Sequence, residues 1–344
     1  MSITVTEHTG DVSALHDIWE KGFASVNAAY SLPPATFESL LSAPLATVFV
    51  ARLHASDEPV GFALTYLIRS GGEGNPAAQH YKGSLAALVV HPRHRGCGVG
   101  GALHDAALTS LEVSVQSSFA RSTPPPTEGE LQLGSIFPRI FPGLPVLDEL
   151  KPTKEWFTKR GWTFPGSQAI DLYGRVPTGV DQEQWKEDAK AHGITFRPAN
   201  PDDEAAVMVL EKEFDSYTGW PDMFPRFFAA GKAGDIHLAF SRDGEVIGAT
   251  LAALAPSPLH DVLAWPATLG KQCAAIACVG VSVKARGTGA GTGICASALQ
   301  DLEARGADGC FIDWVGMKGF YERFGLERWQ APYWDGGRKV LPRT

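Results

Sequence analysis

The sequence has few cysteines, and no two of them have the spacing of a redox pair or a metal-binding pair. Five cysteines form an odd set without a Cys-x-x-Cys arrangement, which argues against a disulfide framework. Four of the five stand among small apolar residues typical of a protein core. The set is Cys97, Cys273, Cys278, Cys295 and Cys310. We therefore expect reduced thiols, a cytoplasmic location and no metal site.

A long apolar run and an excess of positive charge are also absent. No stretch reaches the roughly 18 apolar residues that are needed to span a bilayer, and residues 1–10 contain no apolar signal core. Lysine and arginine number 30 against 38 aspartates and glutamates, a net charge of −8. This balance argues against general binding to nucleic acid or to anionic membranes. The 344 residues, 44% of them hydrophobic, are enough for two globular domains.

What the sequence does contain is an internal repeat. The pattern Arg-Gly-x-Gly-x-Gly occurs at residues 95–100 and again at residues 286–291. Each copy follows an apolar run that is typical of a buried strand, and each precedes apolar residues at helical spacing. A strand, a glycine loop and a helix are therefore predicted twice, in the same order.

Other predicted elements repeat around these loops. Each half begins with an amphipathic helix and a strand pair, and each ends with an aromatic helix stopped by a glycine. These elements are the helices 12–23 and 203–214, the strand pairs 48–52 with 59–68 and 236–241 with 245–253, and the aromatic helices 155–162 and 319–326. The first copy has an additional proline-containing segment at 117–147, which predicts a long loop. We predict an N-terminal domain at 1–175, a linker at 176–193 and a C-terminal domain at 194–344.

The glycine loops have the features of a pyrophosphate site. Glycines at alternate positions let backbone N–H groups converge on an anion, the following helix adds the positive end of its dipole, and arginine is suited to phosphate oxygens. A dinucleotide fingerprint is the main alternative, because Gly96, Gly98 and Gly101 spell Gly-x-Gly-x-x-Gly. That fingerprint calls for an acidic residue about 20 positions on, where Arg121 stands instead. A P-loop lacks its Lys-Ser/Thr, and simple turns would not explain the repeated arginine.

The two loops and the downstream Phe-Tyr-x-x-x-Gly segment resemble the GCN5-related N-acetyltransferase (GNAT) superfamily. In that family, the signature Gln/Arg-x-x-Gly-x-Gly/Ala holds the pyrophosphate of acetyl-CoA. The resemblance covers both halves and implies an α/β (α+β) chain of two tandem GNAT folds, each a twisted, mostly antiparallel sheet flanked by helices. It implies that acetyl-CoA is the co-substrate. The residues that it assigns to acetyl-CoA are Val90, Arg95, Gly96, Cys97, Gly98, Val99 and Gly100, and Val281, Val283, Arg286, Gly287, Thr288, Gly289, Ala290 and Gly291.

The same resemblance implies a catalytic half. A tyrosine in the downstream segment commonly protonates the leaving thiolate in GNAT enzymes, and Tyr321 has that position in the second half. The first half has Phe157 there, which carries no hydroxyl. The second half is therefore predicted to be catalytic and the first to be a silent copy that still binds CoA. Asp313, at the end of an apolar run, is the candidate base. Alternatively, Tyr321 only packs and Asp313 only caps a helix or ends a strand.

The acceptor is predicted to be the amine of a small molecule. Asp215, Tyr217 and Trp220 follow the first helix of the second half, where GNAT substrates are usually enclosed, and His260 is more typical of a surface histidine than of a base. Residues 133–145 resemble fungal GNAT proteins related to the acetyltransferase region fused to β-N-acetylglucosaminidases, which implies an amino sugar such as glucosamine. A protein N-acetyltransferase and a non-catalytic acyl-CoA-binding module are the alternatives. The duplication favours a monomer and leaves a homodimer open.

Overall fold

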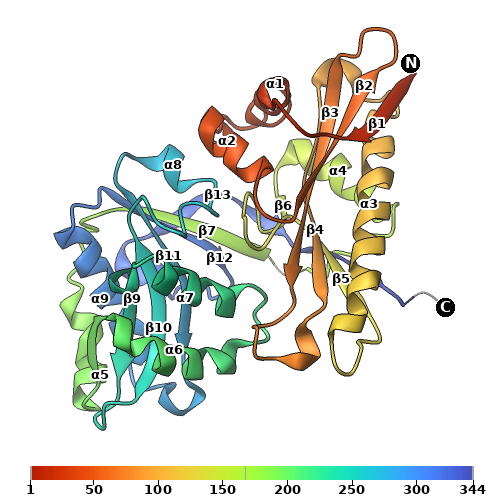
Figure 1. Cartoon of the computed structure of the whole chain (residues 1–344). Helices are drawn as coiled ribbons and strands as arrows, with labels where there is room; N and C mark the ends of the chain where they lie inside the picture. The colour runs from red at the N-terminus through yellow and green to blue at the C-terminus, as the bar shows by residue number, and fades with distance from the viewer. Residues whose placement is uncertain (1, 167, 343–344) are drawn as a thin grey trace.

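Two β-sheets form the framework of the protein (Figure 1). The computed structural model describes residues 2–166 and 168–342. The first sheet has six strands in the order β1-β2-β3-β4-β5-β14, and the second has eight in the order β6-β13-β7-β12-β11-β10-β9-β8. Neighbouring strands run antiparallel except for the pairs β4–β5 and β11–β12, which are parallel. The predicted fold class, two α/β units on mostly antiparallel sheets, is confirmed.

The strands alternate with helices in a similar order in the two halves. The strands are β1 (Ile3–Glu7), β2 (Ala46–Leu53), β3 (Pro59–Arg69), β4 (Tyr81–Val90), β5 (Gly129–Leu133), β6 (Leu144–Pro145), β7 (Gln168–Arg175), β8 (Thr195–Pro198), β9 (Ile236–Phe240), β10 (Val246–Ala253), β11 (Cys273–Val281), β12 (Gly309–Val315), β13 (Glu327–Trp334) and β14 (Gly336–Val340). The α-helices are α1 (Ser13–Trp19), α2 (Pro34–Leu41), α3 (Val99–Ser118), α4 (Lys151–Thr158), α5 (Glu187–Ala191), α6 (Glu204–Glu211), α7 (Trp220–Ala229), α8 (Pro266–Leu269) and α9 (Ala290–Ala304). A π-helical turn, Glu20–Ala24, extends α1.

Alternation along the strands explains why helices cover both faces of the first sheet. Successive side chains in a strand point to opposite faces. In β2, Val48 and Val50 belong to one hydrophobic cluster with residues of α1 and α2, whereas Phe49 and Ala51 belong to another with residues of α3. Both sets are buried. Figure 1 shows α3 along one side of this sheet and α1 with α2 on the other. Consecutive residues of such a strand are hydrophobic because helices cover both faces of the sheet.

The two halves exchange their last strands. Strand β7 follows the first-half elements in the chain but lies between β12 and β13 in the second sheet. Strand β14, near the end of the chain, pairs with β5 in the first sheet through the register Gly336↔Leu133 to Val340↔Gly129. The predicted boundaries at 175 and 193 divide the chain, but each sheet contains a strand from beyond these boundaries: β14 in the first sheet and β7 in the second.

Two predictions about elements need correction. The segment 319–326 is not a helix: a single 3-10 turn, Glu322–Phe324, precedes Gly325 in the left-handed region, at φ 87°. The segment 117–147 is not only a loop, because it contains β5 and β6. The sequence pattern does not predict β5, because this strand has only five residues and follows the prolines at 124–126. The strand pair predicted near the beginning of each half, 48–52 with 59–68 in the first and 236–241 with 245–253 in the second, is confirmed.

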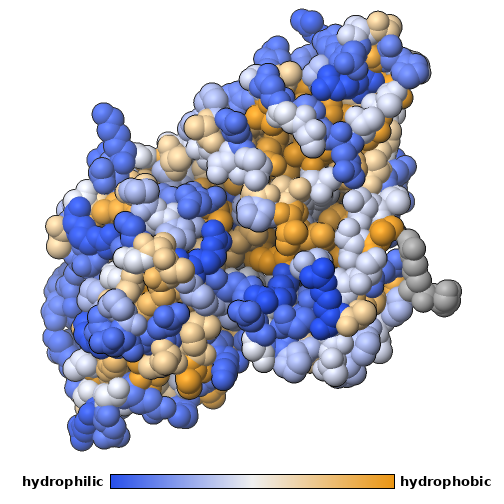
Figure 2. Space-filling model, in the orientation of Figure 1, coloured by the Kyte–Doolittle hydropathy of each residue, from blue (hydrophilic) through white to orange (hydrophobic). Residues whose placement is uncertain are grey.

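Hydrophobic residues also reach the surface between the halves. Figure 2 shows them in the hollow that separates the two halves in this view. Four of the five cysteines are buried and Cys97 is exposed. Within residues 2–166 and 168–342, no helix is long and apolar enough to cross a membrane.

Candidate active site

Each half has a glycine loop between a strand and a helix, at the place where the repeat predicts it. After β4, a 3-10 turn (Pro92–His94) leads to Gly98, which is the N-cap of α3 at φ 88°. After β11, a 3-10 turn (Val283–Ala285) leads to Gly289, the N-cap of α9 at φ 80°. The first N–H groups of a helix have no partners within the helix, so both loops are suited to an anion.

The parallel strands beside each loop separate before they reach it. Strand β4 pairs with β5 only over Gly83–Leu85 and then continues to Val90 with β3 as its one partner. Strand β11 pairs with β12 over Cys273–Ile276 and continues to Val281. Beyond these pairs, the backbone groups on that edge of β4 and β11 are not paired with the parallel neighbour. Both halves thus place a strand with one released edge directly before a phosphate loop.

The first loop is open to a ligand. A Cβ atom added at Gly96 or at Gly98 would meet no atom within 4 Å. Arg93, Arg95 and Cys97 are exposed, whereas Val99 is buried beneath the first turn of α3. Of the other residues assigned to acetyl-CoA here, Val90 and Gly100 are half-buried. The space above Gly96 and Gly98 is therefore open.

The first loop is also strongly basic. Burial lowers the pKa of His91, and the neighbouring basic side chains of Lys21, His94 and Arg93 lower it further, against the opposing effect of Asp17. The guanidinium of Arg95 is held in place because its Nη2 donates to the carbonyl oxygen of Gly22 at 2.7 Å and its Nε to that of Val90 at 3.2 Å. A positive field of this kind attracts a phosphorylated ligand.

The second loop is covered by the linker. A Cβ atom added at Gly289 would lie 2.7 Å from Cβ of Asp188 and 2.8 Å from the backbone nitrogen of Ala189, both in α5. Helix α5 and the 3-10 turn Glu183–Lys186 before it pack on α9. At Gly98, by contrast, an added Cβ would meet no atom of residues 2–166 and 168–342 within 4 Å. The residues assigned to acetyl-CoA in the second half differ in exposure: Val283, Arg286 and Gly287 are exposed, Val281, Thr288, Gly289 and Gly291 are half-buried, and Ala290 is buried.

Carboxylates surround the second loop. Glu213 accepts hydrogen bonds from Oγ of Ser282 at 2.8 Å and from the backbone N–H of Val283 at 3.0 Å. These bonds lower the pKa of Glu213, chiefly through the Val283 N–H, so the group is ionised. Asp188 adds a second acidic side chain at Gly289. Arg286 in the loop and the neighbouring Lys284 oppose these carboxylates, so both signs of charge lie at the second loop.

The predicted catalytic residues of the second half lie close together but are buried. Burial raises the pKa of Tyr321, and Asp313 is near enough to raise it further. Asp313 forms an ion pair with Arg139, a first-half residue. Desolvation raises the pKa of Asp313 and Arg139 opposes that rise. The carboxylate expected to be a base is thus already paired with a cation.

Arg139 is built into the second half through its backbone and its side chain. Its N–H donates to the carbonyl oxygen of Val262 at 2.6 Å, and its own carbonyl accepts from Ala264 at 3.0 Å. The guanidinium lies over the rings of Phe137 and Trp314, at 4.7 Å from each centroid. The first-half segment around Arg139 therefore fills the space beside Asp313.

The predicted acceptor-binding residues lie near the boundary between the halves. Oδ1 of Asp215 accepts a hydrogen bond from the N–H of Gly72 in the first half, at 3.1 Å. Tyr217 and Trp220 stack with their centroids 4.7 Å apart, and Tyr217 is 52% exposed. His260 is half-buried rather than on the surface, and its ring nitrogens contact Oγ of Ser257 and the carbonyl oxygen of Cys273.

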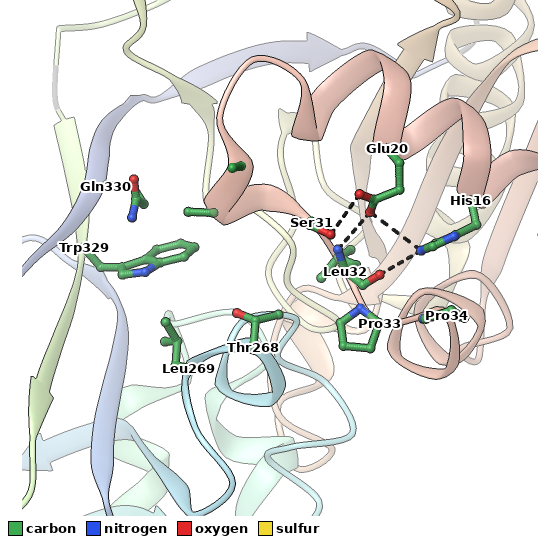
Figure 3. Close-up of a pocket in the computed structure, with 12 residues that line it drawn as sticks. His16, Glu20, Ser31, Leu32, Pro33, Pro34, Thr268, Leu269, Trp329 and Gln330 are labelled. Carbon is green, nitrogen blue, oxygen red and sulfur yellow. Dashed lines mark hydrogen bonds and ion pairs between the residues drawn. The ribbon is translucent and has the colours of Figure 1, made fainter.

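A cleft of about 650 Å³ opens between the halves, beside α1 (Figure 3). His16 and Glu20 lie on one side of it, and Trp329 and Gln330 of β13 lie on the other. Thr268 and Leu269 of α8 form part of its wall. The acidic side chain, the indole and the amide come from both halves, so neither half forms the cleft alone.

Sequence reasoning missed Glu20 and its counterpart Glu211. Residues 19–23 read Trp-Glu-Lys-Gly-Phe and residues 210–214 read Leu-Glu-Lys-Glu-Phe, so the two glutamates have the same place in the repeat. Their surroundings differ: Glu20 is partly exposed in the cleft, whereas Glu211 is 1% exposed. A comparison of the two halves beyond the glycine loops would have found this pair. Nothing in the sequence pointed to Arg139.

The chain is thus built from two copies of one α/β fold, each with a strand that separates from its parallel neighbour, a glycine loop and a helix that follows it. The chain matches the Acetyltransferase (GNAT) family over residues 12–114 and 204–326. It therefore belongs to the GNAT family, with one copy of the fold in each half.

Solved structures give the same result. The chain is 25% identical, with a TM-score of 0.83, to a GCN5-related glucosamine N-acetyltransferase region of a fungal multi-domain GH3 β-N-acetylglucosaminidase; the match covers 98% of this chain and 38% of that one. This chain thus spans less than half the length of that protein. A GCN5-related N-acetyltransferase from Sphaerobacter thermophilus matches at 16% identity and a TM-score of 0.65, over 99% of this chain and 97% of that one.

A further solved structure has the same two-copy arrangement. It is a tandem GNAT protein from the clavulanic acid biosynthesis pathway, 14% identical with a TM-score of 0.59, and the match covers 100% of both chains. At this identity the likeness shows the fold alone. No curated protein matches the chain significantly.

Proposed function

We propose that this protein transfers the acetyl group of acetyl-CoA to the amine of a small acceptor, with an amino sugar such as glucosamine as the leading candidate. The open, basic glycine loop at 95–100 carries the proposal, because it offers free backbone N–H groups and cations to a pyrophosphate. The glucosamine N-acetyltransferase region among the similar structures supports the choice of acceptor.

The reaction needs little from the protein beyond positioning and a path for one proton. The uncharged amine attacks the thioester carbonyl carbon and forms the new C–N bond, and the C–S bond breaks. One proton passes from the amine nitrogen to a base, and the departing thiolate takes up a proton to become the thiol of CoA. Backbone N–H groups on the released edge of β4 are suited to the developing oxyanion. Binding both substrates side by side supplies much of the remaining acceleration.

Two hypotheses compete for the half that performs the chemistry. The first assigns it to the second half, with Tyr321 as the acid for the thiolate and Asp313 as the base. The second assigns it to the first half, with acetyl-CoA on the loop 95–100. The covered Gly289, the carboxylates at the second loop and the Arg139–Asp313 pair favour the first half. We therefore propose that the first half is the working half.

The test is release of CoA thiol from acetyl-CoA by the purified protein with a panel of amines led by glucosamine. The parent protein is compared with Tyr321→Phe, which removes only a buried hydroxyl. Release with glucosamine that survives in Tyr321→Phe supports an amino-sugar acetyltransferase working in the first half. Loss of release in a folded Tyr321→Phe variant moves the chemistry to the second half. Release with another amine alone rejects the amino sugar, and binding of acetyl-CoA without release from any amine rejects the enzyme.

A further inference from the structure

The cleft between the halves has a fixed carboxylate on its first-half side. Oε2 of Glu20 accepts from Oγ of Ser31 at 2.8 Å, and Oε1 accepts from the N–H of Leu32 at 3.1 Å. Nε2 of His16 lies 3.7 Å from Oε1. An ionised carboxylate offers about four acceptor positions, and the Glu20 side chain is still 31% exposed. Glu20 is therefore held in one orientation with capacity left for a cationic ligand.

The second-half side supplies an aromatic ring and an amide. Trp329 lines the cleft with the 6% of its surface that is exposed, and its ring packs against Trp265 at 5.1 Å and Phe311 at 5.6 Å between centroids. The amide oxygen of Gln330 accepts from Nδ2 of Asn27 at 2.9 Å, across the boundary between the halves. Gln330 adopts φ 55°, a left-handed conformation that is uncommon outside glycine. The bond to Asn27 leaves the NH₂ group of Gln330 for a ligand hydroxyl.

We propose that this cleft binds the acceptor as a polyhydroxylated amine, with its ammonium group at Glu20 and its apolar face on Trp329. This inference rests on the proposed function and specifies the acceptor site for it. A small cation with one apolar face is the ligand that matches a single carboxylate across from an indole in a cleft whose other walls are largely apolar. Ser31, Thr268 and Gln330 are the polar residues available to hydroxyl groups.

The same helix connects the cleft to the phosphate loop of the first half. Glu20 begins the π-helical turn that extends α1, and Gly22 in that turn accepts the hydrogen bond from Arg95. The corresponding glutamate of the second half, Glu211, is 1% exposed. The second half thus contributes Trp329 and Gln330 to a site whose charged group belongs to the first half.

Direct binding of glucosamine in the absence of acetyl-CoA tests the site independently of turnover. Titration calorimetry or ligand-detected NMR on the full chain gives the Kd of glucosamine and of its neutral counterpart N-acetylglucosamine. We expect Glu20→Gln to weaken glucosamine binding about ten-fold to one-hundred-fold, as for a lost charge-assisted hydrogen bond. N-acetylglucosamine and acetyl-CoA should bind as before. Trp329→Leu should weaken both sugars while leaving acetyl-CoA unaffected.

Asp17→Asn is the matched control, because Asp17 is an exposed carboxylate on the same helix that pairs with Lys21. It should leave both sugar affinities unchanged. A loss of structure in Glu20→Gln would weaken all three ligands, whereas a loss of the ammonium contact changes only the glucosamine to N-acetylglucosamine ratio. An unchanged ratio in a folded variant overturns the cleft proposal. If acetyl transfer to glucosamine continues with an unchanged KM in Glu20→Gln, the proposed function stands and the cleft fails. Glu20-dependent binding of glucosamine without any transfer leaves the cleft standing and rejects the function.

Discussion

The guanidinium of Arg139, from the first half, forms an ion pair with the carboxylate of Asp313, from the second half, and both side chains are at most 6% exposed. The pair joins two residues that are far apart in the chain and lies where the second half would otherwise have an accessible carboxylate. Buried pairs of this kind are costly to break because the remaining partner keeps its charge without compensation. The contact therefore both joins the halves and closes one candidate site.

Removing one partner of this pair should destabilise the whole chain. We expect Arg139→Leu to lower the free energy of unfolding by about 3–5 kcal/mol, because Asp313 is left buried and unpaired. The double variant Arg139→Leu with Asp313→Leu should recover most of that loss. Urea unfolding followed by tryptophan fluorescence measures both. Lys151→Met, which breaks an exposed pair with Asp148, is the control and should have no measurable effect. A single variant as stable as the parent would show that the pair is dispensable.

The two glycine loops should respond differently to the same substitution. Gly96 and Gly287 have the same place in the repeat, both have positive φ, and a Cβ at either would meet no atom within 4 Å. The backbone strain of a side chain is therefore similar at both. We expect Gly96→Val to raise the Kd of acetyl-CoA about ten-fold or more by obstructing the anion site, and Gly287→Val to leave it close to the parent value. Titration calorimetry should also give one bound acetyl-CoA per chain. Equal effects, or two bound molecules, would mean that α5 does not close the second loop.

The buried carboxyl of Glu211 should make the stability depend on pH. Among the described residues, neither of its oxygens has a hydrogen-bond partner, and burial raises its pKa well above the usual value. The unfolded chain releases this proton at about pH 4.3, the ordinary pKa of glutamate. The folded protein still keeps the proton at that pH. The unfolded state then binds fewer protons, so the stability falls as the pH rises through this range.

Glu211→Met should remove that fall. At pH 8 we expect the variant to exceed the parent by about 1–3 kcal/mol in the free energy of unfolding, and to exceed it by less at pH 5. Urea unfolding at the two pH values gives the difference. Glu213→Gln is the contrasting variant, because the lowered pKa of Glu213 comes from hydrogen bonds that the ionised form accepts. It should be less stable than the parent at pH 8. A Glu211→Met advantage that does not change with pH would argue against a raised pKa.

Removal of the last strand should loosen the first half, although that strand belongs to the end of the chain. Strand β14 covers the edge of β5 and buries Val340. In a chain that ends at Asp335, we expect the free energy of unfolding to fall by about 1.5–3 kcal/mol or more, because burying one Val-sized side chain contributes about that much. Amide exchange by mass spectrometry should show faster exchange at β5, and strand β9 in the second sheet should be unaffected. Faster exchange at β9 alone would contradict the observed pairing.

Local patterns predicted the parts of the site that are built locally. The glycine loops, the strands before them and the helices after them depend on the spacing of residues within about 20 positions, and the internal repeat doubled that signal. The aromatic segment at 319–326 was the exception. Its helix was predicted from the first copy, but Gly319 and Gly325 both have positive φ and leave room for only one 3-10 turn.

Contacts between the halves could not be predicted in this way. No pattern near Arg139 or Asp313 shows that the two side chains meet, and no spacing shows that α5 lies over Gly289. The roles of the two glutamates in the repeat also depend on tertiary surroundings, since the local sequences are nearly the same. The sequence therefore identified the family and both loops, but the choice between the loops required the arrangement of the two halves in space.

The exchange of β7 and β14 has a consequence for how such a chain can arise and change. If the ancestor was a pair of identical subunits that swapped their final strands, fusion into one gene would fix the partners in a one-to-one ratio. Neither copy could then be deleted, because each completes the sheet of the other. Each copy would nevertheless be free to diverge in its loops. A retained but altered second copy, with a covered glycine loop and new side chains facing its neighbour, is the outcome that such a history favours.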